Sequence, residues 1–184
     1  MGDRHNSTAP FQRARSSNEL PSTLHHNELA GVYFNPAYGT LTLCPYPPSN
    51  TFEPPRRECD GITESEALQP LLNHSAPALL AGWPKVWSTH VFFYHVSGDT
   101  FNITTVLTFP APFPDAPKGD DDSRPFAVQT GNASAEFVFG TRPEGNTKYV
   151  EGIACTGLWG AGYGVKPPKG GGREGAEVWF DRVT

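Results

Sequence analysis

Apolar and polar side chains alternate along several stretches of the chain, and this alternation predicts β-strands. The clearest stretch is 101–109, where one face carries Phe101, Ile103, Leu107 and Phe109, and the other carries Asn102, Thr104 and Thr108. A period of two residues is typical of a strand with one buried face. Alternation also predicts a hairpin over 32–43, with its turn at 35–39. Further strands are expected at 83–96, 133–139, 148–159 and 176–183.

Turn-forming and helix-breaking residues divide the rest of the chain. Ser97, Gly98 and Asp99 predict a tight hairpin between the two central strands, and 144–146 predicts another turn. The five prolines of 44–62 predict a loop or a sheet edge, because proline lacks the donor that a ladder needs. Residues 64–80 have moderate helix propensity but are interrupted by two prolines.

The two ends of the chain differ in character. Residues 1–22 hold few apolar side chains and are expected to form a disordered tail, so the folded domain is expected to span 23–184. Within 24–30 a short helix or turn is predicted, with Asn27 as its cap. The result is an all-β domain of seven or eight antiparallel strands, arranged as a sandwich or as a closed barrel with no exposed edge.

Composition and charge exclude several classes of protein. The 19 Gly and 19 Pro among 184 residues exclude an all-helical bundle. A net charge of −5 with no basic stripe argues against a nucleic-acid partner. The apolar run at 91–94 is far shorter than the roughly 20 residues that span a bilayer, so no membrane association is expected.

Cysteines and glycosylation sequons are features typical of an extracellular protein. We favour a disulfide between Cys44 and Cys59, because a proline-rich segment needs such a link, and Cys155 is left over. The alternative is three free thiols in a reducing compartment. Asn-x-Ser/Thr sequons begin at Asn6, Asn73, Asn102 and Asn132, of which the last three fall in the folded domain. The first residues do not resemble a signal peptide, so the localisation is left open. We expect an extracellular location if this chain is the tail of a secreted precursor.

No constellation in the sequence predicts chemistry of its own. His90 and His95 are five residues apart on one strand and therefore point to opposite faces, so no metal site is expected. The acidic run 120–122 lacks the ligand spacing of a calcium loop. The glycines of 157–164 lack the spacing of a phosphate-binding loop. We predict no catalytic residue, no metal and no cofactor.

Several motifs together resemble a known family. LAGVYFNPAYGTLTLC (29–44) resembles the opening of the C-terminal domain of serine hydrolases of the β-lactamase and penicillin-binding-protein clan, peptidase family S12. WPKVWSTHVFFYHVSGDTFNITTVLTFP (83–110), Ala135–Val138, GLWG (157–160) and AEVWFDRV (176–183) resemble the version found in fungal members. The resemblance covers about residues 24–184. It implies a lipocalin-like barrel of about eight strands that follows a catalytic domain.

The resemblance gives three functional hypotheses. In the first, the chain is a non-catalytic accessory domain that packs on a serine hydrolase catalytic domain, in cis or in trans, and keeps an exposed aromatic patch that includes Trp83, Trp87 or Trp159. In the second, the barrel carries a small apolar ligand. The side chains expected to point into the barrel are bulky, and this favours a filled core over a ligand cavity. They are Phe101, Ile103, Leu107, Phe109, Phe137 and Phe139.

The third hypothesis, an unrecognised hydrolase site, is the weakest. The family's Ser-x-x-Lys nucleophile motif is missing, since no Ser in this chain is followed by Lys three positions later. The Tyr-x-Asn triplet at 33–35 matches one family element, but it falls within a strand that packing already explains. We therefore expect that this chain is not an enzyme.

Overall fold

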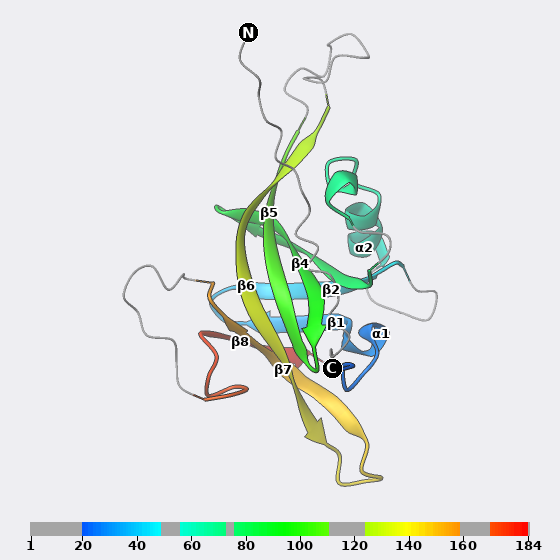
Figure 1. Ribbon diagram of the computed structural model, residues 1–184, viewed down its shortest axis with the longest axis vertical. Helices are drawn as coiled ribbons and strands as arrows, with labels where there is room; N and C mark the ends of the chain where they lie inside the picture. Colours follow the sequence, from blue (N-terminus) through cyan, green and yellow to red (C-terminus); the bar gives the residue numbers. More distant parts are fainter. Residues whose placement is uncertain (1–19, 49–55, 73–75, 111–123, 159–169, 184) are drawn as a thin grey trace.

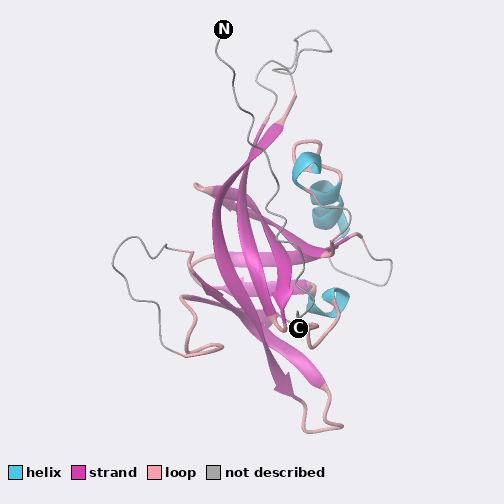
Figure 2. Cartoon of the chain, in the orientation of Figure 1, coloured by secondary structure: helices cyan, strands magenta, loops and turns pink. Residues whose placement is uncertain are grey.

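A computed structural model describes residues 20–48, 56–72, 76–110, 124–158 and 170–183, which fold into a closed barrel with small helices outside it (Figures 1 and 2). The helices are α1 (His26–Leu29), α2 (Arg56–Thr63) and a single 3₁₀ turn (Gln69–Leu71). The strands are β1 (Gly31–Asn35), β2 (Gly39–Tyr46), β3 (Ala78–Lys85), β4 (Ser88–Ser97), β5 (Thr100–Phe109), β6 (Phe126–Thr141), β7 (Lys148–Thr156) and β8 (Val178–Val183).

The strands close into a ring in sequence order. Each strand pairs antiparallel with the next, and β1 returns to pair with β8, Val32 opposite Val183 and Phe34 opposite Asp181. The predicted all-β class is therefore confirmed, and of the two architectures left open it is the eight-stranded antiparallel closed barrel. Closure gives β1 and β8 a partner on both sides and removes the edge that an open sheet would expose.

Three of the predicted hairpin turns form where the turn residues place them. In the β1–β2 turn the Asn35 side-chain carbonyl accepts hydrogen bonds from the backbone amides of Ala37 and Tyr38. In the β4–β5 turn Gly98 has φ +56°, a conformation that strongly favours glycine. The β6–β7 turn likewise falls at the predicted Glu144–Asn146 segment.

The prediction of one strand over 83–96 is only partly right, because 88–96 belong to β4 whereas 83–85 end β3 and a hairpin turn separates the two. β3 already begins at Ala78, and Lys85 pairs with Ser88 across a turn at Val86 and Trp87. Apolar side chains at both turn positions disguised the turn in the sequence. The helix-prone stretch 64–80 correspondingly ends in β3, whose run Ala78–Ala81 is wholly buried.

The prediction of a loop or edge over 44–62 is only partly right. β2 continues to Tyr46 and includes Pro45, which lies past Leu43, the last β2 residue that pairs with β1. The proline is therefore in a part of the strand with a neighbour on one side only, where a missing donor costs little. Helix α2 then packs on the outside of the barrel and encloses a second apolar cluster of Cys44, Tyr46, Ile62, Leu80, Phe92 and Val106.

The strand predicted at 133–139 is longer than expected, because β6 begins at Phe126. Its polar middle, Gln129–Asn132, hid the strand, since alternation breaks there. Thr130 is an extra residue opposite the Thr105–Val106 step of β5. Such a bulge changes the phase of alternation. As a result Thr130 and Gly131 both approach Thr105, and Ala133, Ala135 and Phe137 continue into the core.

The last predicted strand segments are close to the observed ones. β7 ends at Thr156, three residues before the expected end, and Trp159 lies outside the described residues. The short helix α1 forms within 24–30, but its cap is His25 rather than Asn27. The His25 ring accepts a hydrogen bond from the Asn27 amide, and the Glu28 carboxylate accepts one from the His25 amide.

The expected tail overlaps a described segment that contacts the barrel. Leu20 exchanges hydrogen bonds with the β4–β5 turn through Ser97 and Gly98, and Thr23 donates to the Asp99 carboxylate. Residues 1–19 lie outside the described residues.

Candidate functional site

The two ends of the barrel differ, and the difference locates the candidate site. At one end α1 lies across the barrel, and Leu29 and Ala30 enter the core. The Arg182 guanidinium holds this end together, since it donates to the carbonyls of Glu28 and Ala30 and to the Tyr33 hydroxyl. Burial raises the pKa of Tyr33 above its ordinary value, so the hydroxyl is a neutral donor to the Leu29 carbonyl. This end is closed.

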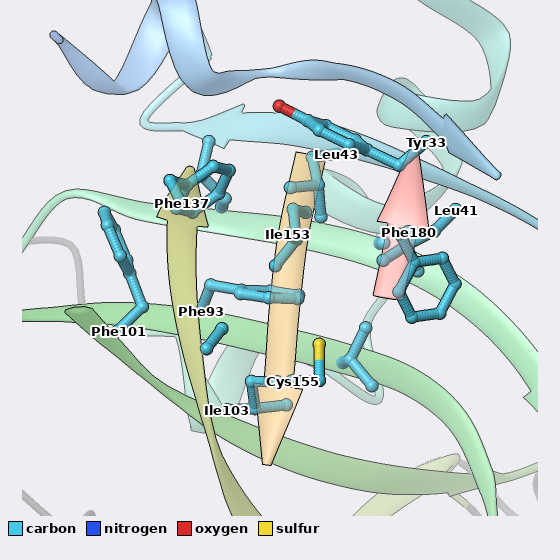
Figure 3. Close-up of a cluster of buried hydrophobic side chains, with 14 of the residues drawn as sticks. Tyr33, Leu41, Leu43, Phe93, Phe101, Ile103, Phe137, Ile153, Cys155 and Phe180 are labelled. Atoms are coloured by element: carbon cyan, nitrogen blue, oxygen red, sulfur yellow. The ribbon is translucent and has the colours of Figure 1, made fainter. Parts of the chain in front are cut away.

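The interior between the two ends is filled by side chains (Figure 3). Phe93, Phe101 and Phe137 pack edge to face or tilted in the middle, with ring centroids 5.0 to 6.5 Å apart. Three of the six residues predicted to point inward, Phe101, Ile103 and Phe137, are buried here, and Phe139 packs partly buried against them. A filled interior is what a small eight-stranded barrel commonly has.

A small void remains near the opposite end. Its volume is about 10 Å³, the space of about one water molecule, and its lining includes Trp83, Cys155, Leu158 and Phe180. The indole N–H of Trp83 has no hydrogen-bond partner among the described residues, although its side chain is buried. Burial raises the pKa of the Cys155 thiol to about 12, so the free cysteine is an unreactive neutral group here.

The rim of this second end is built from turns. The Lys85 amino group donates to the Tyr38 carbonyl at 2.8 Å and lies 6.0 Å from the ring centroids of Tyr38 and Trp83. Trp83 packs edge-on against Trp87, which is 44 % exposed. The prediction that Trp83 is exposed is therefore wrong. Trp83 is buried beneath the rim, because Tyr38 and Trp87 pack against it. Trp87 is on the surface, as predicted.

A two-stranded ribbon rises from the same rim (Figure 1). Residues 107–109 of β5 pair with 126–128 of β6 beyond the last residues that β4 and β7 pair with. Leu107 and Phe109 keep the inward phase of the strand but lie above the barrel, so the prediction that they fill the core is wrong. Phe109 and Phe126 stack at 5.0 Å between centroids, and both are exposed.

Exposed apolar side chains lie on the ribbon and on the neighbouring turn, and we term them together the mouth patch. Thr130 joins the two parts, because its hydroxyl donates to the Trp87 carbonyl and to the Thr105 hydroxyl. The other face of the ribbon is covered, since Ala127 packs against the α2 cluster. The exposed members of the patch are Val86, Trp87, Phe109, Phe126 and Val128.

Sequence reasoning missed most of this patch. The strands predicted from the sequence do not include Phe126 and Val128, and one of them, 83–96, includes Val86. The signal that pointed to the ribbon was the alternation of Phe126 and Val128 with Ala127 and Gln129, which ends at the bulge after four residues.

The predicted disulfide is confirmed. The Cys44 and Cys59 sulfurs are bonded, with 5.5 Å between the Cα atoms, and the bond ties α2 to β2. Among the sequons, Asn102 is half-buried on the outer face of β5 and Asn132 is exposed on β6, whereas Asn6 and Asn73 lie outside the described residues.

The histidines and the other chemical candidates do not converge. His90 and His95 do face opposite sides of β4, since His90 bonds to Thr89 and His95 packs against the buried Phe101. Desolvation lowers the pKa of His90. No three His, Cys, Asp or Glu residues within the described ranges are grouped to hold a metal ion. The acidic run 120–122 and glycines 160–164 lie outside those ranges.

Comparison with known proteins leaves the family open. No family model, no curated protein and no solved structure matches this chain. In the part of the chain that the structure describes, no helix is long and apolar enough to cross a membrane. The architecture itself, an eight-stranded antiparallel closed barrel, is consistent with a lipocalin-like fold.

Proposed function

We propose that this barrel is a non-catalytic accessory domain of a β-lactamase-like serine hydrolase of peptidase family S12, which packs against the hydrolase catalytic domain. The observation that carries the proposal is the mouth patch. Trp87, Phe109 and Phe126 are 44, 39 and 48 % exposed, on a turn and a ribbon that the Thr130 hydroxyl links. Soluble domains rarely gather large apolar side chains in this way unless a partner covers them.

The chemistry of the patch suits a protein partner. Its five members are aromatic or aliphatic, and a charge-poor centre rich in Phe and Trp is typical of the buried core of protein interfaces. The other face of the ribbon packs through Ala127 against the α2 cluster, which leaves the face with Phe109 and Phe126 for a partner. The partner is expected to present a complementary apolar groove.

The filled interior favours this role over that of a carrier. A carrier of a small apolar ligand needs a cavity of some hundreds of Å³, whereas the void beneath the rim measures about 10 Å³. A carrier therefore requires that side chains such as Leu158 move aside. Saturable displacement of a fluorescent fatty acid by the purified chain would support the carrier instead.

Binding to a defined hydrolase domain tests the proposal. The probe is the purified catalytic domain of an S12 serine hydrolase from the same organism, made without any C-terminal barrel, and titrated with this chain by calorimetry. We expect saturable binding that Phe126→Ala and Trp87→Ala each weaken about tenfold or more, because central aromatics dominate interface energies.

The matched control is Phe34→Ala. Phe34 is 42 % exposed, close to the exposure of Trp87, but lies on the outer face of β1 away from the patch. It should leave the affinity unchanged. Absence of binding to the catalytic domain, or an equal loss for the Phe34 variant, contradicts the proposal. Turnover of nitrocefin or a simple ester by the chain alone would favour the enzyme hypothesis.

A further inference from the structure

Three of the histidines gather at the closed end of the barrel. His25 and His26 belong to the segment that carries α1, and His95 is on β4 next to it. The ring centroid of His26 lies 6.0 Å from that of His25 and 6.0 Å from that of His95. The rings of His26 and His95 also contact the buried Phe101 edge to face. Because imidazole ordinarily gains its charge between about pH 8 and 5, this end of the barrel is sensitive to mild acid.

His25 caps α1 only in its neutral form. Its Nδ1 accepts a hydrogen bond from the Asn27 amide, so this nitrogen carries no proton. The Glu28 carboxylate accepts the reciprocal bond from the His25 amide. A protonated imidazole is a donor at both ring nitrogens and cannot accept. Uptake of a proton by His25 therefore removes one half of the capping box and turns a donor toward the Asn27 amide.

His95 contributes repulsion rather than a broken bond. Its Nε2 lies 2.8 Å from the Gly98 carbonyl, and because a carbonyl oxygen only accepts, Nε2 is the nitrogen that carries the proton. A second proton, on Nδ1, leaves this bond intact. It adds a positive charge beside the ring of His26, and that charge opposes protonation of both rings while they stay in contact.

The charged groups around the three rings do not balance three imidazolium ions. Among the described residues, the carboxylates at this end are Glu28 on α1 and Asp99 in the β4–β5 turn, which accepts hydrogen bonds from residues 22 and 23. The Arg182 guanidinium of β8 is a cation already in place, and it donates to the Glu28 carbonyl. Neutral histidines leave one cation for two carboxylates, whereas three protonated histidines make four cations for two carboxylates.

Residues 20–30, which we term the strap, cover apolar side chains at this end. Leu29 and Ala30 are buried in the main core, and Leu24 packs partly buried against it. The strap is otherwise held by hydrogen bonds to the β4–β5 turn and to Arg182. Since β1 begins at Gly31, release of the strap exposes an apolar end of the barrel and leaves the ring of strands paired.

We propose that the strap is a pH-sensitive lid, which is closed at neutral pH and is released in mild acid by protonation of His25, His26 and His95. The released strap takes up protons that the closed strap resists, so the closed form loses stability as the pH falls from about 7 to 5.5. The mouth patch lies at the other end of the barrel. The lid therefore neither requires nor excludes the proposed hydrolase contact, and each proposal can fail alone.

Hydrogen exchange of the full chain tests the proposal at about pH 7.5 and 5.5, with each rate corrected for the intrinsic effect of pH. The amides of Glu28, Leu29 and Ala30 bond to carbonyls at the start of α1 and report on the strap. We expect their protection to fall about tenfold or more at the lower pH, whereas the paired amides of β4 and β5 keep theirs. Equal protection at both pH values overturns the proposal. A parallel loss in β4 and β5 also overturns it, since the whole barrel then unfolds.

A triple variant separates the histidines from the carboxylates. His25→Asn keeps a capping acceptor, His26→Phe keeps an aromatic ring, and His95→Gln keeps a donor for the Gly98 carbonyl. The strap of this variant should stay protected at both pH values. If it opens in acid as readily as the wild-type strap, the carboxylates are responsible and the proposal is wrong.

The matched control is His90→Gln. His90 is also on β4, but its ring bonds to Thr89 and is not among the three that gather at the strap. The strap of this variant should open in acid as it does in the wild-type chain. Loss of the response in the control would contradict the assignment of the lid to His25, His26 and His95. Protection of β4 and β5 at neutral pH verifies that each variant is folded.

Discussion

At the scale of single residues, the barrel depends on positions where nothing larger fits. Gly152 on β7 is buried, and a Cβ built there meets the Phe180 carbonyl and the Trp179 ring. Since the Phe180 carbonyl belongs to the backbone of the neighbouring strand β8, it cannot move aside without opening the β7–β8 pair. Gly152 is therefore a packing requirement rather than a turn residue.

We predict that Gly152→Ala destabilises the fold by about 1 to 3 kcal/mol, the usual cost of forcing an extra group into a packed site. The measurement is the free energy of unfolding in urea. Gly82→Ala is the matched control, because Gly82 is also a strand glycine but a Cβ there meets nothing within 4 Å. A similar loss in both variants would mean that strand flexibility, and not the contact with β8, is what matters.

The buried thiol of Cys155 gives the fold a weakness at high pH. Burial, with a smaller contribution from Glu177, raises its pKa from 9.0 to about 12 in the folded chain. Between these values the unfolded chain loses a proton that the folded chain keeps, so stability falls as pH rises. The slope from this one group is about 1.4 kcal/mol per pH unit.

In Cys155→Ala the free energy of unfolding should therefore fall less steeply between pH 9 and 12, by the slope that one proton contributes. Near neutral pH the variant should be less stable than the wild type, because packing is lost. Urea unfolding at several pH values measures both effects. The pKa of Tyr94 is raised to about 12, chiefly by burial, so Tyr94 also makes stability fall at alkaline pH. Tyr94 is unchanged in both proteins, so the difference between their slopes reports Cys155. An unchanged slope would show that the thiol is already ionised in the fold.

At the scale of elements, the disulfide decides whether α2 stays on the barrel. Cys44 is on β2 and Cys59 on α2, 15 residues apart, and the segment between them includes residues 49–55, outside the described ranges. A link of this length restricts the unfolded chain by about 3 kcal/mol on the chain-entropy estimate. The apolar cluster under α2 is small, so the helix depends on the link.

Cys44→Ser with Cys59→Ser is expected to lower the free energy of unfolding by about 2 to 4 kcal/mol. Hydrogen exchange should show early loss of protection in α2 while β4 and β5 remain protected, because these strands belong to the main core as well. Addition of reductant to the wild-type chain provides the comparison without a mutation. Uniform loss of protection over the whole barrel would mean that α2 and the barrel unfold as one unit.

Elements that alternate regularly were predictable from the sequence, and those that deviate were not. The hairpin of β1 and β2 and the strand at 101–109 follow a period of two, and the structure has them where expected. The bulge at Thr130 breaks the period, so half of β6 was missed. Val86 and Trp87 occupy a turn that polar residues usually fill. The mouth patch depends on these two irregularities, which is why only Trp87 of its members was foreseen.

At the scale of the whole molecule, the ribbon concentrates the surfaces that are available to partners. The α1 end is sealed by Arg182, the barrel wall is paired all round, and the interior is filled. The open end carries the mouth patch on the ribbon and the neighbouring turn. A partner that binds the barrel is therefore expected at this end, where large apolar side chains are exposed.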